Sequence, residues 1–81
     1  MLTQYIGAAL GLARYELMED GRFFAEIAEL PGVWADGASL EECRETLREV
    51  VEDWIMLGLK HGDELPVVGG FGLRSVGNRV A

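Results

Sequence analysis

The chain has 81 residues, enough for one domain but not for a second hydrophobic core. Hydrophobic residues make up 49% of it, which excludes a disordered chain, and the formal net charge is −7. Twelve acidic side chains and only three arginines lie between Tyr15 and Asp53, so this region should repel nucleic acid and attract a basic protein. The same charges could instead serve only to keep a small protein soluble.

The expected location is the cytoplasm. The single cysteine, Cys43, cannot form an internal disulfide, and no signal-like segment opens the chain. No apolar run approaches the roughly 20 residues of a membrane-spanning helix, so no membrane contact is expected. A domain of this size buries only about 60–65% of its unfolded surface and is marginal when alone, which favours a partner subunit.

The first third of the chain predicts a helix followed by a β-hairpin. Apolar residues recur at helical spacing over residues 2–13, although two glycines weaken that helix. Two alternating runs, residues 14–19 and 22–28, are joined by Asp20-Gly21. Since an Asp-Gly pair suits a type I′ turn, in which both central residues have positive φ, we expect a two-residue hairpin loop.

A second turn and a third strand follow. Pro31-Gly32 suits a type II turn, and residues 33–36 are then a short strand, so the three strands should form an antiparallel meander. Phe24 and Trp34 are expected on the face opposite the other apolar side chains. That second face would need a cover, from the N-terminal helix or from another subunit.

A long helix of about 22 residues is predicted from Leu40 to His61. Ser39 and Glu42 form an S-x-x-E capping box, in which the carboxylate should accept from the N–H of Ser39. Gly62 is the expected residue beyond the helix end. The stripe expected to lie on the sheet consists of Leu40, Cys43, Leu47, Val50, Val51, Trp54, Leu57 and Gly58.

The second half of this helix is apolar on every side, because residues 54–59 include no charged side chain. A helix that is apolar all round is buried all round. We therefore expect a homo-oligomer, a dimer or tetramer, formed through this region; burial by the chain's own N-terminal helix is the alternative. The expected interface residues are Trp54, Ile55, Met56 and Leu59.

The predicted fold class is α+β: an N-terminal helix, a three-stranded antiparallel meander, and one long helix packed on the sheet. Pro66 keeps the chain extended after the long helix, and residues 73–80 could add a fourth strand or remain a tail. The turn and cap positions that define this fold are Asp20, Gly21, Pro31, Gly32, Gly37, Ser39, Glu42 and Gly62.

No catalytic group, metal site or cofactor is predicted. His61, the only histidine, lies eighteen residues from Cys43 along one helix, roughly 27 Å, so the two cannot meet. Cys43 sits on the apolar stripe and is expected in the core. Four carboxylates share a helix face, but a helical metal site needs ligands from several elements, so a solvated charged face is favoured. The four carboxylates are those of Glu41, Glu45, Glu49 and Asp53.

The run AEIAELPGVWADGASLEECRETLREVVEDWI closely resembles the HicB family of antitoxins in its Pro31-Gly32 turn, its Gly-Ala-Ser step and its Glu-Glu-Cys helix start. The later HGDELP is also similar. The likeness covers residues 13–68 of a single domain, 1–81, and leaves a Gly-rich extension over residues 69–81. It implies a partial ribonuclease-H-like fold without that enzyme's active site. It also implies a protein that neutralises HicA, a small basic ribonuclease.

Many HicB members carry a C-terminal DNA-binding domain, and the Gly-rich extension does not supply one, so direct operator binding is not expected. The leading hypothesis is an antitoxin-type interaction protein. The alternative is a solitary oligomeric module that binds a small molecule or another protein, with Phe24, Trp34 and the strand edges lining a pocket. An enzyme is the least favoured class, and a metal-dependent nuclease activity that is abolished by changing Glu49 or Asp53 would revive it.

Overall fold

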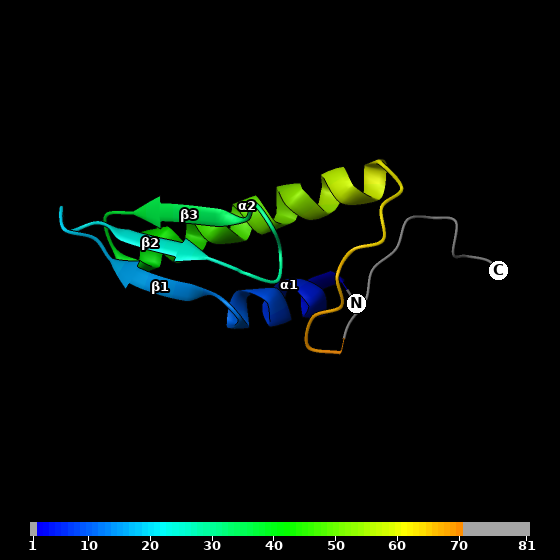
Figure 1. The fold of residues 1–81 in the computed structure, drawn as a ribbon, viewed down its shortest axis with the longest axis horizontal. Helices are drawn as coiled ribbons and strands as arrows, with labels where there is room; N and C mark the ends of the chain where they lie inside the picture. Colours follow the sequence, from blue (N-terminus) through cyan, green and yellow to red (C-terminus); the bar gives the residue numbers. More distant parts are fainter. Residues whose placement is uncertain (1, 71–81) are drawn as a thin grey trace.

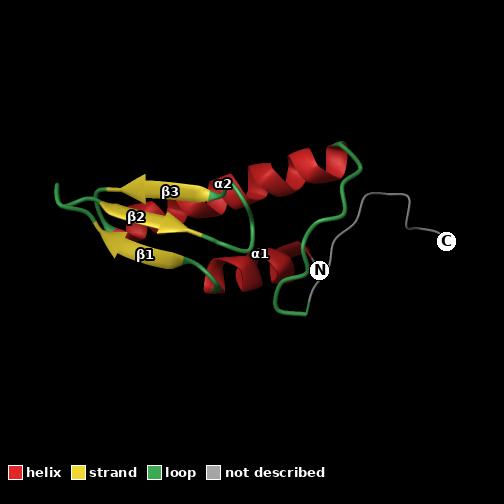
Figure 2. Ribbon diagram, in the orientation of Figure 1, coloured by secondary structure: helices red, strands yellow, loops and turns green. Residues whose placement is uncertain are grey.

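A three-stranded antiparallel sheet packs on one long helix in the computed structural model, which describes residues 2–70 (Figures 1 and 2). The elements in order are α1 (Leu2–Gly11), β1 (Arg14–Leu17), β2 (Phe23–Glu26), β3 (Trp34–Gly37) and α2 (Leu40–Lys60). The predicted α+β order is confirmed for this part of the chain. The predicted fourth strand, over residues 73–80, lies outside the described residues.

The sheet has one covered face and one open face. Strand order is β1-β2-β3, and Ala25 of β2 lies opposite Tyr15 on one side and Ala35 on the other. Both alanines are buried against α2, whereas Phe24 and Trp34, at the alternating positions, point to the other face, as predicted. The N-terminal helix, one of the two covers expected for this open face, does not cover it, because α1 packs on α2 (Figure 1).

The β1–β2 hairpin closes through a different turn from the predicted one. The N–H of Met18 donates to the carbonyl of Arg22 at 2.7 Å, and the N–H of Gly21 donates to the carbonyl of Met18 at 3.0 Å. The loop between Met18 and Arg22 therefore has three residues rather than two. Gly21 has a φ of 87°, but Asp20 does not have a positive φ. A turn followed by a left-handed glycine is the common three-residue loop. The hairpin prediction is confirmed and the type I′ turn is wrong.

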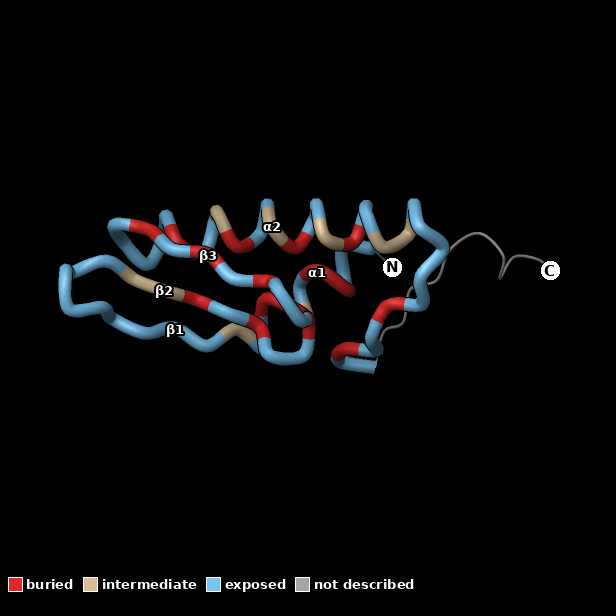
Figure 3. Tube along the Cα trace, turned by 45° about the horizontal axis from the view of Figure 1, so that its top comes forward, coloured by how far each residue is buried: buried red, intermediate tan, exposed pale blue. Residues whose placement is uncertain are grey.

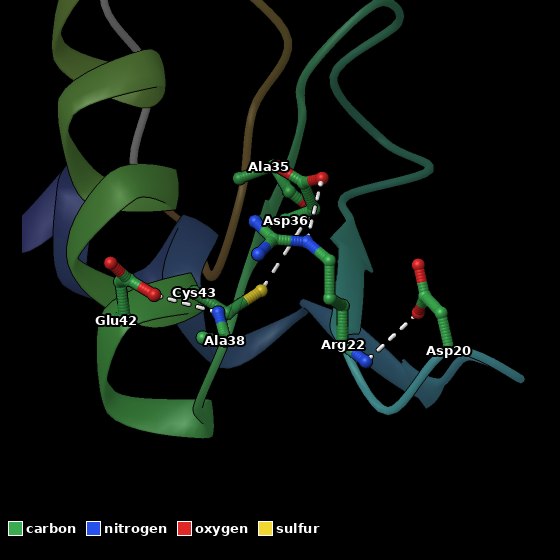
Figure 4. A network of polar contacts seen from close by, with 7 residues as sticks. All are labelled: Asp20, Arg22, Ala35, Asp36, Ala38, Glu42 and Cys43. Carbon is green, nitrogen blue, oxygen red and sulfur yellow. Dashed lines mark hydrogen bonds and ion pairs between the residues drawn. The ribbon is translucent and has the colours of Figure 1, made fainter.

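The start of α2 is capped almost as predicted. Ser39 is extended and its Oγ accepts from the N–H of Glu42 at 3.1 Å. The Glu42 carboxylate returns to the N–H of Ala38 at 2.6 Å rather than to that of Ser39 (Figure 4). Both bonds satisfy N–H groups at the start of the helix, so the capping box sets where α2 begins.

Gly37 lets the end of β3 lie against this first turn. A Cβ at Gly37 would stand 2.6 Å from the backbone nitrogen of Cys43, closer than side-chain carbons approach. The Cys43 thiol in turn lies 3.8 Å from the carbonyl oxygen of Ala35, a weak hydrogen bond (Figure 4). Glycine is therefore required here by the close approach of two backbones.

Beyond α2 the chain folds back towards α1 (Figure 1). Gly62 has a φ of 80°, and the N–H of Asp63 donates to the carbonyl of Gly58 at 2.9 Å, which is the Schellman ending expected for that glycine. The hydroxyl of Tyr5, a fully buried residue of α1, donates to the carbonyl of Pro66 at 2.6 Å. This bond ties the returning segment to the N-terminal helix.

The buried face of α2 rotates along the helix, and this changes two sequence-based expectations. A four-residue step exceeds a 3.6-residue turn, so a stripe at that spacing turns by about 40° per step. The stripe begins against the sheet and ends against α1 (Figure 3). Leu57, expected on the sheet, is 56% exposed, and Leu40, in the first turn, is also exposed. The buried residues of α2 are Cys43, Leu47, Val51 and Ile55.

Candidate interaction surfaces

The outer side of α2 carries four exposed carboxylates at a spacing of four residues. We call them the acidic ladder: Glu41, Glu45, Glu49 and Asp53. All four are exposed, and each is two residues, or about 200° around the helix, from a residue of the buried stripe. Glu49 has a carboxylate at each of three positions one turn away and no basic residue at any of them. The ladder is therefore a region of mutual repulsion on an exposed surface.

Two arginines interrupt the charge near the start of the ladder. A shallow depression of about 420 Å³ lies there, lined by Ser39, Glu41, Glu42, Arg44, Glu45 and Arg48. The residues that line it are all polar or charged, with charges of both signs. Such a surface suits contact with a charged protein better than enclosure of a small apolar ligand.

The open face of the sheet carries a second surface, centred on two aromatic rings. Phe24 and Trp34 stack with their ring centroids 5.9 Å apart and an angle of 26° between the planes. Trp34 is 55% exposed. At one end of this face Arg22 pairs with Asp36 at 3.6 Å (Figure 4). We call the two rings the aromatic platform.

The third surface is the apolar end of α2, where the structure separates the predicted interface residues. Met56 is 64% exposed, whereas Trp54 and Leu59 are only half-buried against the core. Ile55 is completely buried within the chain, so it belongs to the core between α1 and α2. Leu57, which the sequence placed on the sheet, is exposed instead. The rotation of the buried stripe along α2 turns Leu57 away from the core.

Grooves flank this apolar end on both sides. One, of about 330 Å³, runs between α1 and α2 and is lined by Leu2, Ile6, Glu52, Asp53, Ile55 and Met56. The other, of about 520 Å³, lies beside the returning segment and includes Trp54, Leu57 and His61. Exposed apolar side chains beside grooves are typical of contact surfaces between proteins.

The cysteine of the chain lies in the core. Cys43 is fully buried, and burial, with a smaller contribution from Asp36 against Arg22, raises the pKa of its thiol. It is therefore a protonated thiol at neutral pH, which is a poor nucleophile. Within residues 2–70, His, Cys, Asp and Glu side chains form no group of three or more that could hold a metal ion.

The fold and these surfaces define a small α+β domain built on one long helix, and neither described helix is long and apolar enough to cross a membrane. Residues 4–66 match the UPF0150-like family, so the chain belongs to this HicB-like family. The resemblance inferred from the motifs is confirmed at that level. The chain is also similar to TTHA0281 from Thermus thermophilus, whose crystal structure superposes with a TM-score of 0.84 at 42% identity. The match covers 89% of this chain and 90% of that one. No curated protein matches the chain.

Proposed function

We propose that this protein is an antitoxin-type interaction protein that binds a small basic HicA-like ribonuclease toxin and neutralises it by direct contact. Membership of a HicB-like family supports the class of protein. The acidic ladder is the observation that carries the choice of partner, because its charge is the opposite of that of a basic ribonuclease. The proposed location is the cytoplasm, where such a toxin would meet RNA, and neither catalysis nor nucleic-acid binding is part of the proposal.

The ladder suits this function for a physical reason. Like charges four residues apart destabilise a helix by roughly 0.2–0.5 kcal/mol per pair, so the free protein is less stable with the ladder than without it. A basic partner removes that repulsion on binding. The net charge of −7 also accelerates the first encounter with a cationic protein, and this acceleration weakens as salt is added.

Co-expression with a small basic HicA-like protein from the same genome tests the proposal. A stable complex should form and relieve the growth defect that the basic protein causes. The variant Glu45→Lys/Glu49→Lys, which reverses the centre of the ladder, should bind at least about tenfold more weakly. The matched control Glu19→Lys/Glu29→Lys makes the same charge change in exposed loops and should bind almost as the wild type. Equal loss in both variants would show that only net charge matters, and no loss in either would remove the ladder from the interface.

A second candidate is a solitary homo-oligomeric module, favoured by the exposed apolar end of α2. We propose that Met56 and Leu57, together with the half-buried Trp54 and Leu59 of the same helix end, form the contact between copies. Light scattering should then give a dimer or tetramer that Met56→Glu dissociates. Leu17→Glu, at a residue 63% exposed on the hairpin, is the matched control and should leave the assembly intact. A strict monomer at micromolar concentration would contradict this proposal.

A further inference from the structure

The open face of the sheet arranges its side chains in two rows that cross all three strands. One row is Arg14, Glu26 and Trp34, and the other is Glu16, Phe24 and Asp36, as the strand register requires. Directly opposed side chains on one face of a sheet have Cβ atoms about 4.5–5.5 Å apart. Phe24 therefore has a carboxylate on each side, and Trp34 has Glu26 beside it. The aromatic platform is surrounded by carboxylates on three sides.

One of these carboxylates is already engaged and two are not. Asp36 pairs with Arg22 at 3.6 Å. Glu16 and Glu26 make no ion pair in the described part of the chain, although Arg14 lies opposite Glu26. The exposed ring of Trp34 and the free carboxylate of Glu26 are thus available together to one ligand group.

We propose that the aromatic platform binds an arginine side chain of the basic partner, stacked on Trp34 and donating hydrogen bonds to Glu26. This inference rests on the proposed function, because it takes a basic protein as the partner. A guanidinium is planar and weakly hydrated, so it can stack on an aromatic ring while its N–H groups bind a carboxylate. A lysine ammonium would lose the stacking. The chemistry of the platform thus selects arginine over lysine.

The other occupant of this face would be a second copy of the chain, and charge disfavours it. Each copy has a net charge of −7, so sheet-to-sheet packing would bring the carboxylates around one platform close to those around the other. An arginine-bearing partner brings the opposite charge. Trp and Arg are also among the residues enriched at the energetic centre of protein interfaces.

The test measures the fluorescence emission of Trp34. The chain has two tryptophans, so Trp54→Phe leaves Trp34 as the only tryptophan, and its emission is recorded with excitation at a wavelength that tyrosine does not absorb. Titration with an acetylated tetra-arginine amide should change its emission saturably, and tetra-lysine should need a concentration at least about threefold higher. In calorimetry, Trp34→Ala and Glu26→Gln should each weaken the tetra-arginine affinity at least about threefold. Glu29→Gln, in the loop after β2, is the matched control and should leave it unchanged.

The outcomes separate this inference from the proposed function. If tetra-arginine leaves the Trp34 emission unchanged and its binding is lost only in Glu45→Lys/Glu49→Lys, the inference is overturned while the ladder proposal stands. If Trp34 and Glu26 carry the peptide affinity but the HicA-like protein does not bind, the inference stands and the toxin assignment fails. If the wild type is a dimer that Trp34→Ala dissociates, a second copy occupies the face and the inference is overturned.

Discussion

Replacing Gly37 by alanine should destabilise the protein strongly, because the space for a methyl group is occupied by backbone. The new Cβ would stand 2.6 Å from the nitrogen and 2.9 Å from the Cα of Cys43, and 3.1 Å from the carbonyl carbon of Glu42. Ordinary contacts begin at 3.4 Å. The first turn of α2 would therefore have to move away from β3 by most of an ångström, although its cap holds it in place.

Overpacking of this kind typically costs roughly 1–3 kcal/mol, and the upper end applies here because the obstructing atoms cannot rotate away. A domain of this length has a free energy of unfolding of roughly 4–12 kcal/mol, so the loss would be a large part of it. Urea unfolding followed by circular dichroism should show a midpoint about 2 M lower than that of the wild type.

Gly7→Ala is the matched control for this prediction. Gly7 lies inside α1, and a Cβ there would meet nothing within 4 Å. The same change of glycine to alanine should therefore stabilise the protein, by about 0.5–1 kcal/mol. If Gly37→Ala unfolded at the same urea concentration as the wild type, the close approach of β3 and α2 would not exist as described.

Two further changes test other contacts. Tyr5→Phe removes the hydrogen bond to the Pro66 carbonyl and should lower the free energy of unfolding by about 1 kcal/mol, whereas Tyr15→Phe, at an exposed position, should not. Burial raises the pKa of Tyr5 above its usual 10.0, so the folded state keeps this proton longer than the unfolded chain does. The stability linked to Tyr5 is therefore present below pH 10 and falls as the pH rises above it. The loss of stability at high pH should be smaller in Tyr5→Phe than in the wild type. An identical loss in both proteins would contradict the raised pKa of Tyr5. Glu49→Gln removes three like-charge pairs of α2 and should stabilise the protein by about 1 kcal/mol at low salt, less at high salt; a loss of stability would show that the ladder is not self-repelling.

The local elements could be predicted because the bonds that form them join residues close in the chain. Ser39 and Glu42 cap α2 through N–H groups within four residues, and Gly62 ends it through the turn just before it. The alternation of apolar residues likewise put Phe24 and Trp34 on one face. The predicted type I′ turn is wrong because Asp-Gly is compatible with two loop lengths, and the pairing of the two strands decides between them.

Only the tertiary structure decides which side of α2 is buried beyond the end of the sheet. Residues 54–59 are apolar all round, so their sequence contains no periodicity from which a buried side could be read. The docking of α1 buries Ile55 and leaves Met56 and Leu57 exposed. The need for glycine at position 37 has the same origin, since it depends on how closely two backbones approach. Sequence by itself thus determined the elements, their order and the faces of the sheet, whose causes are local. The side of α2 that meets α1, and with it the apolar surface left exposed, depends on contacts between residues far apart in the chain.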